Sequence, residues 1–257
     1  MKLTKLFPVA LGMACAMLLS SCSKEDAQAP QPLVEGANGH SNAKTNAGEV
    51  VLPTFSHTIS PEVNWNLFPR GWEKTYHLGN TAPVDAGSSS LTSLWGHANK
   101  PWTKPLPLLP SNATAKSILT VKSYGTNTTT SLYRSVVTTT IKDLIPEKTY
   151  SITFYVASTV HGEIPFNSTD LPTYAKAGYV KLYPYENGSA IETTVDLTGK
   201  EAQWVKKTIT FKPTRNYAMF FFSGLTPAAG KHSYIHLFVD NNSIKELVTF
   251  QPGVVVM

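Results

Sequence analysis

The chain has very little cysteine, with two such residues among 257, Cys15 and Cys22. Both lie close to the amino terminus, so everything after residue 22 can form neither a disulfide nor a thiolate metal site. That part of the chain must therefore be stabilised by its hydrophobic core. The segment 51–250 is long enough to bury well over half of the surface that it exposes when unfolded.

Recognisable catalytic motifs are also missing. The sequence has no Gly-x-Ser-x-Gly elbow, no His-Glu-x-x-His motif and no phosphate-binding loop. Glycoside hydrolysis needs two carboxylates across one cleft, and no pair of acidic residues stands out for that role. We expect no catalytic residue, and we expect that the protein is not an enzyme.

The charge of the chain is nearly balanced, with 22 basic and 17 acidic residues. No basic patch is interleaved with aromatic residues, as is typical of nucleic-acid-binding proteins. Nucleic acid is therefore not an expected partner.

Residues 1–21 are typical of a secretory signal peptide. Lys2 and Lys5 precede an apolar stretch over 6–19, which is shorter than the roughly 20 residues that cross a bilayer. We expect this segment to direct export and then to be removed. The alternative is an uncleaved amphiphilic anchor.

The run Leu19-Ser20-Ser21-Cys22 resembles the lipobox of bacterial lipoproteins. The resemblance implies cleavage before Cys22, acylation of this residue and attachment of the mature chain to a membrane. The following Lys24-Glu25-Asp26 resembles the acidic signal that sends Bacteroidetes lipoproteins to the outer leaflet of the outer membrane. This second resemblance implies an outer-membrane protein that faces the cell exterior. Alternatively, the acidic pair belongs to a solvated linker.

Three further parts follow the signal peptide. Residues 22–50 comprise the lipidated cysteine and a flexible tether, because 27–49 contains too few aliphatic and aromatic residues to form a core. A flexible segment of that length reaches roughly 30 Å from the membrane. Residues 51–250 form the single predicted domain, and 251–257 form a tail.

The predicted domain is all-β. Residues 150–156 alternate between apolar and polar with the β-branched and aromatic composition of a half-buried strand. Similar patterns, bounded by turn-forming residues, occur at 132–141, 179–183, 207–211, 217–222 and 234–239. Many strands without long helical periodicity predict an antiparallel sandwich or barrel.

Three blocks resemble the galactose-binding-like jelly rolls, the architecture of many carbohydrate-binding modules. They are the turn and strand at 144–157, Trp204 with the strand at 208–211, and the closing segment 238–244. The resemblance implies an antiparallel jelly-roll sandwich and a glycan-binding function without catalysis. It also implies structural roles for Trp72 and Trp204.

The family's structural calcium site is not expected in full, so no cofactor is predicted. The usual acidic pair near the first tryptophan is absent, and Asp240 is the single counterpart of the calcium ligands. An aspartate at the end of a strand also serves as a hydrogen-bond acceptor in a turn, which is the alternative role for Asp240.

Aromatic residues are the candidates for ligand binding. Trp95 and Trp102 lie in a predicted loop, and a flat ring can pack against the apolar face of a sugar. Tyr234 and His236 lie opposite the core-facing side chains of their strand and form a second candidate surface. In both cases there is an alternative: the two tryptophans plug the end of the sandwich, and the loop 101–110 covers the strand face.

Two functions remain open after the sequence alone. The first is a surface lipoprotein that binds an oligosaccharide. The second is a structural or adhesive surface protein that binds another protein or host material. Exposure of Trp95 and Trp102 beside polar groups favours the first function, and burial of both favours the second.

Replacing Cys22 by serine should abolish membrane attachment, because the serine hydroxyl cannot replace the acyl-accepting thiol. Each methylene of an inserted acyl chain contributes on the order of 0.8 kcal/mol to membrane binding, which a surface patch cannot replace. Cell fractionation checks this expectation. Wild-type amounts of the serine variant in the membrane fraction would contradict the lipoprotein hypothesis.

The matched control replaces Lys24, Glu25 and Asp26 by alanine while keeping Cys22. This variant should remain in the membrane fraction but should lose its digestion by protease added to whole cells. Equal digestion of the wild-type and alanine chains would assign the acidic run to the linker.

Overall fold

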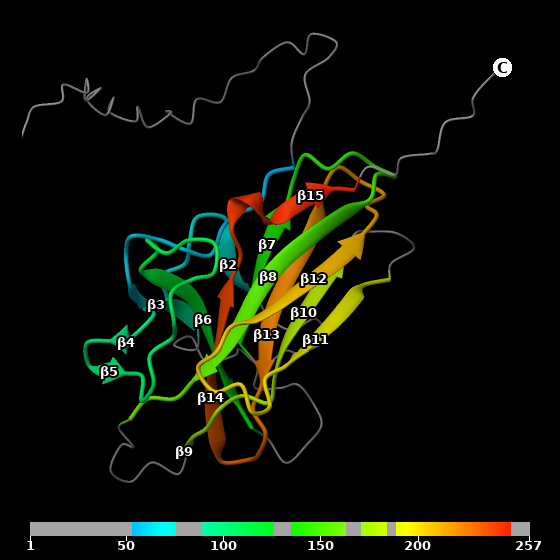
Figure 1. The fold of residues 1–257 in the computed structure, drawn as a ribbon. Coiled ribbons are helices and arrows are strands. Elements are labelled where there is room, and N and C mark those ends of the chain that lie inside the picture. The colour runs from blue at the N-terminus through cyan, green and yellow to red at the C-terminus, as the bar shows by residue number, and fades with distance from the viewer. Residues whose placement is uncertain (1–52, 76–88, 126–134, 163–170, 184–188, 248–257) are drawn as a thin grey trace, which may run out of the picture. The chain divides into compact units, whose positions relative to one another are not determined.

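The computed structural model describes residues 53–75, 89–125, 135–162, 171–183 and 189–247 (Figure 1). These residues all belong to one compact unit, Glu49–Met257. The signal peptide, Cys22, the acidic run, the tether and the tail fall outside the described residues, and their roles stay predictions. Within the described ranges, no helix has the length and apolar character required to span a bilayer.

Two β-sheets make up the described part of the chain. The first has the order β12 (Val205–Phe211), β8 (Tyr150–Thr159), β14 (Lys231–Phe238), β6 (Ser117–Tyr124), β3 (Ser89–Ser93), β4 (Gly96–His97) and β5 (Lys100–Pro101). Three short strands extend it: β1 (Asn64–Trp65) on β3, β15 (Ile244–Glu246) on β8, and β9 (Leu171–Pro172) on β14. The second sheet has the order β11 (Ile191–Asp196), β10 (Ala177–Tyr183), β13 (Ala218–Leu225), β7 (Val136–Ile141) and β2 (Trp72–Thr75). A 3-10 turn, η2 (Asn241–Ser243), precedes β15.

The strand pairing is that of a jelly roll. β10 pairs with β11, β8 with β12, β7 with β13 and β6 with β14, so the pairs are nested one outside the other along the chain. β6, β8, β12 and β14 lie in the first sheet, and β7, β10, β11 and β13 lie in the second. Apart from β10 and β11, consecutive strands of this set therefore alternate between the two sheets. All of these pairs are antiparallel, and among the described strands the short β9 alone runs parallel to its neighbour β14. The predicted all-β antiparallel jelly-roll sandwich is therefore confirmed.

The alternating sequence patterns correspond to β8, β10, β12, β13 and β14, and the predicted strand at 132–141 contains β7. Among the described strands of six or more residues, β6 and β11 were not predicted. β6 is buried on both faces over most of its length, so its sequence SILTVKSY does not alternate. β11 lies at the edge of its sheet, and the polar Thr193 stands between Ile191 and Val195 on its less exposed face. Burial of both faces removes the period of two from β6, and Thr193 interrupts the apolar positions of β11.

An aromatic cluster fills the space between the two sheets. Phe220 on β13 is fully buried, and its ring lies 5.6 Å from Phe55, 6.0 Å from Trp72 and 5.9 Å from Phe154, each in an edge-to-face arrangement. The Trp72 indole N–H donates to the Ser56 carbonyl at 2.9 Å, so the ring is buried with its polar atom satisfied. The prediction that Trp72 is structural is confirmed.

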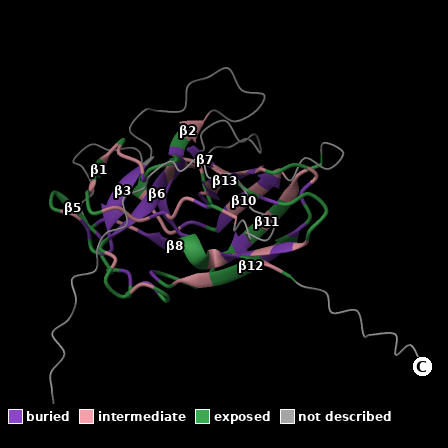
Figure 2. Cartoon of the chain, turned by 90° about the horizontal axis from the view of Figure 1, so that it is seen from above, coloured by how far each residue is buried: buried purple, intermediate pink, exposed green. Residues whose placement is uncertain are grey.

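A second apolar cluster lies on the other face of the first sheet. The segment 94–116 brings Leu94, Leu106 and Leu109 against Ile118 on β6 and Phe238 on β14. Figure 2 shows the result, with β6 and β3 coloured as buried and the edge strand β12 mostly as intermediate or exposed. The first sheet is thus covered on both sides at its centre.

Phe220→Ala should destabilise the fold by about 3–5 kcal/mol, because it leaves a cavity where three aromatic rings meet. The control is Phe221→Ala on the opposite face of β13, where the side chain is half-buried against Tyr183. Urea unfolding of both variants checks the difference. Equal losses of unfolding free energy would contradict the inward orientation of Phe220.

Candidate functional site

The four aromatic residues predicted to bind a ligand have very different environments. The exposed fraction is 50% for Trp95 but 5% for Trp102, 3% for Tyr234 and 0% for His236. The structure therefore brings Trp102, Tyr234 and His236 together in the interior and leaves Trp95 at the surface. Exposure of both tryptophans was expected for saccharide binding, and burial of both for an adhesive function. The structure meets neither condition in full, because Trp95 is exposed and Trp102 is buried.

Trp102 covers the outer face of β14. Its ring centroid lies 5.1 Å from that of Tyr234 and 5.2 Å from that of His236, and its indole N–H donates to the Ser93 carbonyl at 3.3 Å. A backbone bridge to His161 holds the same residue in place. The alternation predicted for β14 is confirmed. Trp102, Tyr234 and His236 do not form an open ligand-binding surface, because the alternative holds in which segment 101–110 covers this face.

His236 is buried beneath this cover as a neutral imidazole. Its two ring nitrogens lie 2.9 Å from the Thr120 hydroxyl and 2.7 Å from the Thr159 hydroxyl, and Thr120 continues the network to Thr92 at 2.6 Å. Hydroxyls can donate or accept, so both nitrogens of a neutral ring are satisfied. Burial lowers the pKa of His236 from 6.5 to about 3.

Trp95 is presented by a rigid turn between β3 and β4. Its carbonyl accepts the backbone N–H of Trp102 at 2.9 Å, and the neighbouring Leu94 carbonyl accepts that of Leu106 at the same distance. Gly96 completes the turn at a φ of +108°, where a Cβ would come within 2.7 Å of the Lys100 carbonyl oxygen. The backbone that buries Trp102 therefore also fixes the position from which Trp95 projects.

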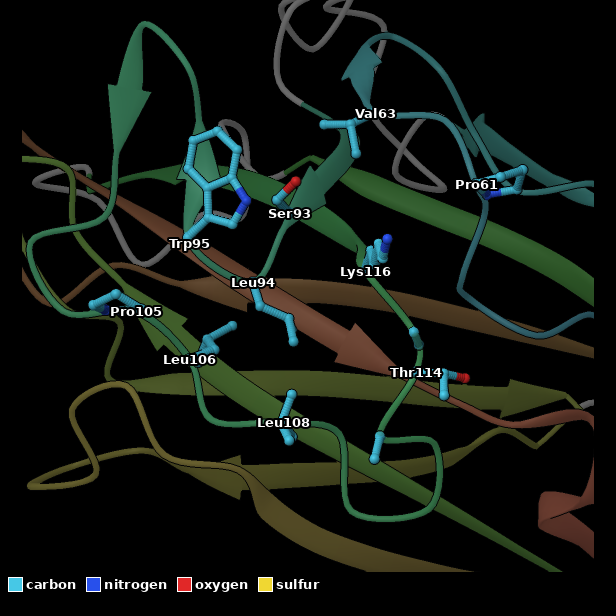
Figure 3. A pocket seen from close by; sticks show the side chains of 12 residues that line it. Pro61, Val63, Ser93, Leu94, Trp95, Pro105, Leu106, Leu108, Thr114 and Lys116 are labelled. Carbon is cyan, nitrogen blue, oxygen red and sulfur yellow. The ribbon is translucent and has the colours of Figure 1, made fainter. Parts of the chain in front are cut away.

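A surface groove with a volume of about 740 Å³ lies beside Trp95. Its lining residues are Pro61, Val63, Ser93, Leu94, Trp95, Pro105, Leu106, Leu108, Ala113, Thr114, Ala115 and Lys116. Figure 3 shows Trp95, Leu106 and Leu108 along one side of the groove and Lys116 and Thr114 along the other. Most of the lining is apolar, with polar groups from Ser93, Thr114 and Lys116.

A second groove of about 470 Å³ adjoins the first one and shares Pro61, Thr114, Ala115 and Lys116 with it. It adds His57, Ile59, Ser60 and Asn112. We call the two grooves with this shared lining the Trp95 trough. It follows the border between the segment 57–63 and the segment 105–116.

Asp240, the candidate calcium ligand, follows β14 and is half-buried. Its Oδ2 accepts a hydrogen bond from the Ser111 hydroxyl at 3.3 Å, and its side chain makes no capping hydrogen bond to the following turn η2. In the described part of the chain, no group of three or more His, Cys, Asp or Glu side chains is placed to hold a metal ion. The expectation that no cofactor is bound, with Asp240 as the single counterpart of the calcium ligands, stays a prediction.

Trp204 joins the proline-rich segment to the first sheet. Its indole N–H donates to the Pro107 carbonyl at 3.1 Å, and its ring packs edge-to-face against Phe238 at 6.4 Å. Both contacts hold the segment that forms one side of the trough. The structural role predicted for Trp204 fits this position.

Sequence reasoning identified Trp95 but missed the rest of the trough. Val63 comes from the segment 57–63 and Leu108 and Lys116 from the segment 105–116, and none belongs to a recognisable motif. Leu108, with 64% of its surface exposed, is the one residue whose apolar character in a proline-rich loop could have drawn attention.

The chain matches no protein-family model, and a comparison with curated proteins finds no match. Solved structures that it resembles include a carbohydrate-binding module, TmCBM61, in complex with β-1,4-galactotriose, at 10% identity over 69% of this chain and 88% of the other, with a TM-score of 0.38. A cleaved adhesin domain of Lys-gingipain from Porphyromonas gingivalis is 14% identical over 74% of this chain and 98% of its own, with the same TM-score. A second cleaved adhesin domain of Lys-gingipain is 14% identical over 77% and 100%, with a TM-score of 0.39. At these identities and TM-scores the likenesses support no argument about a ligand, and the jelly roll rests on the strand pairing above.

Acidification should destabilise the fold through His236. The pKa of about 3 in the folded chain lies below the ordinary 6.5, so between these values the unfolded chain binds a proton that the folded chain does not. The contribution of His236 is therefore complete above about pH 6.5 and decreases as the pH falls, by up to about 1.4 kcal/mol per pH unit, until it levels off near pH 3. Urea unfolding of wild type and His236→Gln at about pH 7 and about pH 5 should show a smaller pH dependence in the variant, and parallel losses would contradict this role.

Proposed function

We propose that this protein is a lipid-anchored surface protein of the outer membrane that binds a saccharide in the Trp95 trough without catalysing a reaction. The observation that carries the proposal is the half-exposed Trp95 ring, held by a rigid turn at the side of an open groove. A large aromatic ring left in water has no benefit for the fold, whereas it offers a flat surface to the CH groups of a sugar.

Preorganisation supports this use of Trp95. The turn is held by two backbone hydrogen bonds and by the burial of Trp102, so little conformational freedom would be lost when a ligand binds. The groove beside Trp95, about 740 Å³ in volume, is also within the size range of small-molecule sites, about 300–1,000 Å³.

The polar groups of the trough can orient a sugar. The Ser93 and Thr114 hydroxyls can donate or accept hydrogen bonds, and the Lys116 ammonium can donate. A few polar groups among apolar side chains are what a saccharide site needs, because sugar rings have apolar faces and hydroxyl edges. The resemblance of three sequence blocks to carbohydrate-binding modules points in the same direction, and the absence of catalytic motifs supports a role in binding alone.

The membrane part of the proposal depends on the amino-terminal sequence. Cys22 in its lipobox and the acidic run after it support a lipid anchor on the cell exterior, and 27–49 would separate the binding domain from the membrane. A saccharide-binding domain held in this way would collect oligosaccharides close to the cell surface.

An adhesive function is the second candidate, and one specific observation favours it. The trough is mostly apolar, and Leu108 exposes 64% of its surface at its side. Such a surface also suits an apolar segment of another protein. Leu108→Ser should weaken binding of a protein partner more than Trp95→Ala does, whereas stacking of a sugar ring depends on Trp95.

Trp95→Ala should weaken saccharide binding by about 1–3 kcal/mol, or roughly 5- to 150-fold in Kd, and should change the melting temperature little. A glycan array with the mature chain carrying Cys22→Ser identifies the ligand, and calorimetry measures the affinity. The control is Trp102→Ala, which removes a buried ring and should cost about 3–5 kcal/mol of stability.

The two tryptophans are thus expected to show opposite patterns. Unchanged affinity of Trp95→Ala for every glycan that binds the wild type would remove the trough as the site. A large loss of stability in Trp95→Ala would instead make this residue part of the core.

A further inference from the structure

We infer that the Trp95 trough selects acidic saccharides, and that Lys116 binds their carboxylate or sulfate group. This inference rests on the proposed function, that the trough takes a saccharide at all. It adds the class of sugar and a residue that determines specificity.

Lys116 occupies the position where the two grooves meet. It lines both of them, together with Pro61, Thr114 and Ala115. A ligand that extends from the Trp95 ring into the second groove must therefore pass the Lys116 side chain. In Figure 3 this side chain lies across the groove from Leu94 and Trp95.

The backbone beneath Lys116 is firmly held. Ser117, the next residue, begins β6 and pairs with Ser93 of β3. The Ser117 hydroxyl also accepts the backbone N–H of Ser60 at 2.8 Å and hydrogen-bonds to the Ser60 carbonyl, which fastens the 57–63 segment beside it. The ammonium group is thus carried on a flexible side chain, but its point of attachment and the opposite wall are fixed.

The charge of the trough is positive on balance. Neither groove has an aspartate or glutamate among its lining residues, and Lys116 has no ion-pair partner among the described residues. The second titratable lining side chain is His57. Glu62 lies between two lining residues in sequence but is exposed and does not line either groove. An unpaired ammonium at the junction favours an anionic group in the ligand.

Charge and shape together define the ligand class. The Trp95 ring needs an apolar sugar face, and two grooves with a shared lining suit a chain of more than one sugar. Lys116 needs a negative group one or more sugars away from the stacked ring. Uronic acids and sulfated sugars combine both properties in one oligosaccharide, and neutral sugars do not.

The test compares trigalacturonate with its fully methyl-esterified form, two probes that share a backbone and differ in charge. The mature chain carrying Cys22→Ser should bind the acid more tightly than the ester, and Lys116→Gln should reduce affinity for the acid about 3- to 5-fold with little change for the ester, as expected for an exposed ion pair. Added salt should weaken acid binding more than ester binding. A sulfated galactotriose serves as the second anionic probe and shows which anion Lys116 prefers.

Lys206→Gln is the matched control. Lys206 is exposed on β12, at the opposite end of the first sheet from β3, and does not line the trough. Its substitution should leave both affinities unchanged. The melting temperatures of both lysine variants should equal that of the wild type, since both side chains are exposed.

The outcomes separate this inference from the proposed function. If Trp95→Ala weakens binding of acidic and neutral probes while Lys116→Gln leaves their ratio unchanged, the inference is wrong and the saccharide function stands. Equal or weaker binding of both acidic probes relative to the ester also overturns the inference. If no glycan on an array binds the wild type, the proposed function fails, and the inference fails with it.

Discussion

The outer face of the first sheet carries large side chains at its centre that must be kept from water. β14 presents Tyr234, His236 and Phe238 on that face, and all three are buried. The segment 94–116 provides the cover by placing Trp102 over Tyr234 and His236 and its leucines over Phe238. The position of this segment, and with it the groove on its surface, follows from the burial of one strand.

The same cover explains how a buried polar network is tolerated. His236 would destabilise an apolar interior if its nitrogens were unpaired, but Thr120 and Thr159 satisfy both of them. Tyr234 and Trp102 complete the enclosure from above. The threonines on β6 and β8 therefore hydrogen-bond on the outer face of the first sheet, while the apolar residues that alternate with them pack in the core between the sheets.

The segment that covers the outer face of β14 carries the Trp95 trough on its own surface. Backbone hydrogen bonds from Trp102 and Leu106 fix the turn at residues 94–96, and Trp95 projects from this turn into solvent. Two tryptophans seven residues apart in the sequence, Trp95 and Trp102, thus acquire opposite environments through the same contacts. The trough consists of the residues that the covering segment and 57–63 leave at the surface after their apolar neighbours have packed inward.

The sequence by itself determined the all-β class and most of the long strands, because side-chain alternation and turn residues are local properties, whereas the core position of Trp72 was expected from the family resemblance. The sequence did not determine β6, whose two buried faces remove the alternation, or β11, whose apolar positions Thr193 interrupts. Only the tertiary structure decided that Trp102 is covered and Trp95 is exposed, and that Val63, Leu108 and Lys116 line one trough. Those outcomes depend on how segments distant in sequence pack on the sheet. The solvent-accessible area that each side chain buries there cannot be predicted from a local sequence pattern.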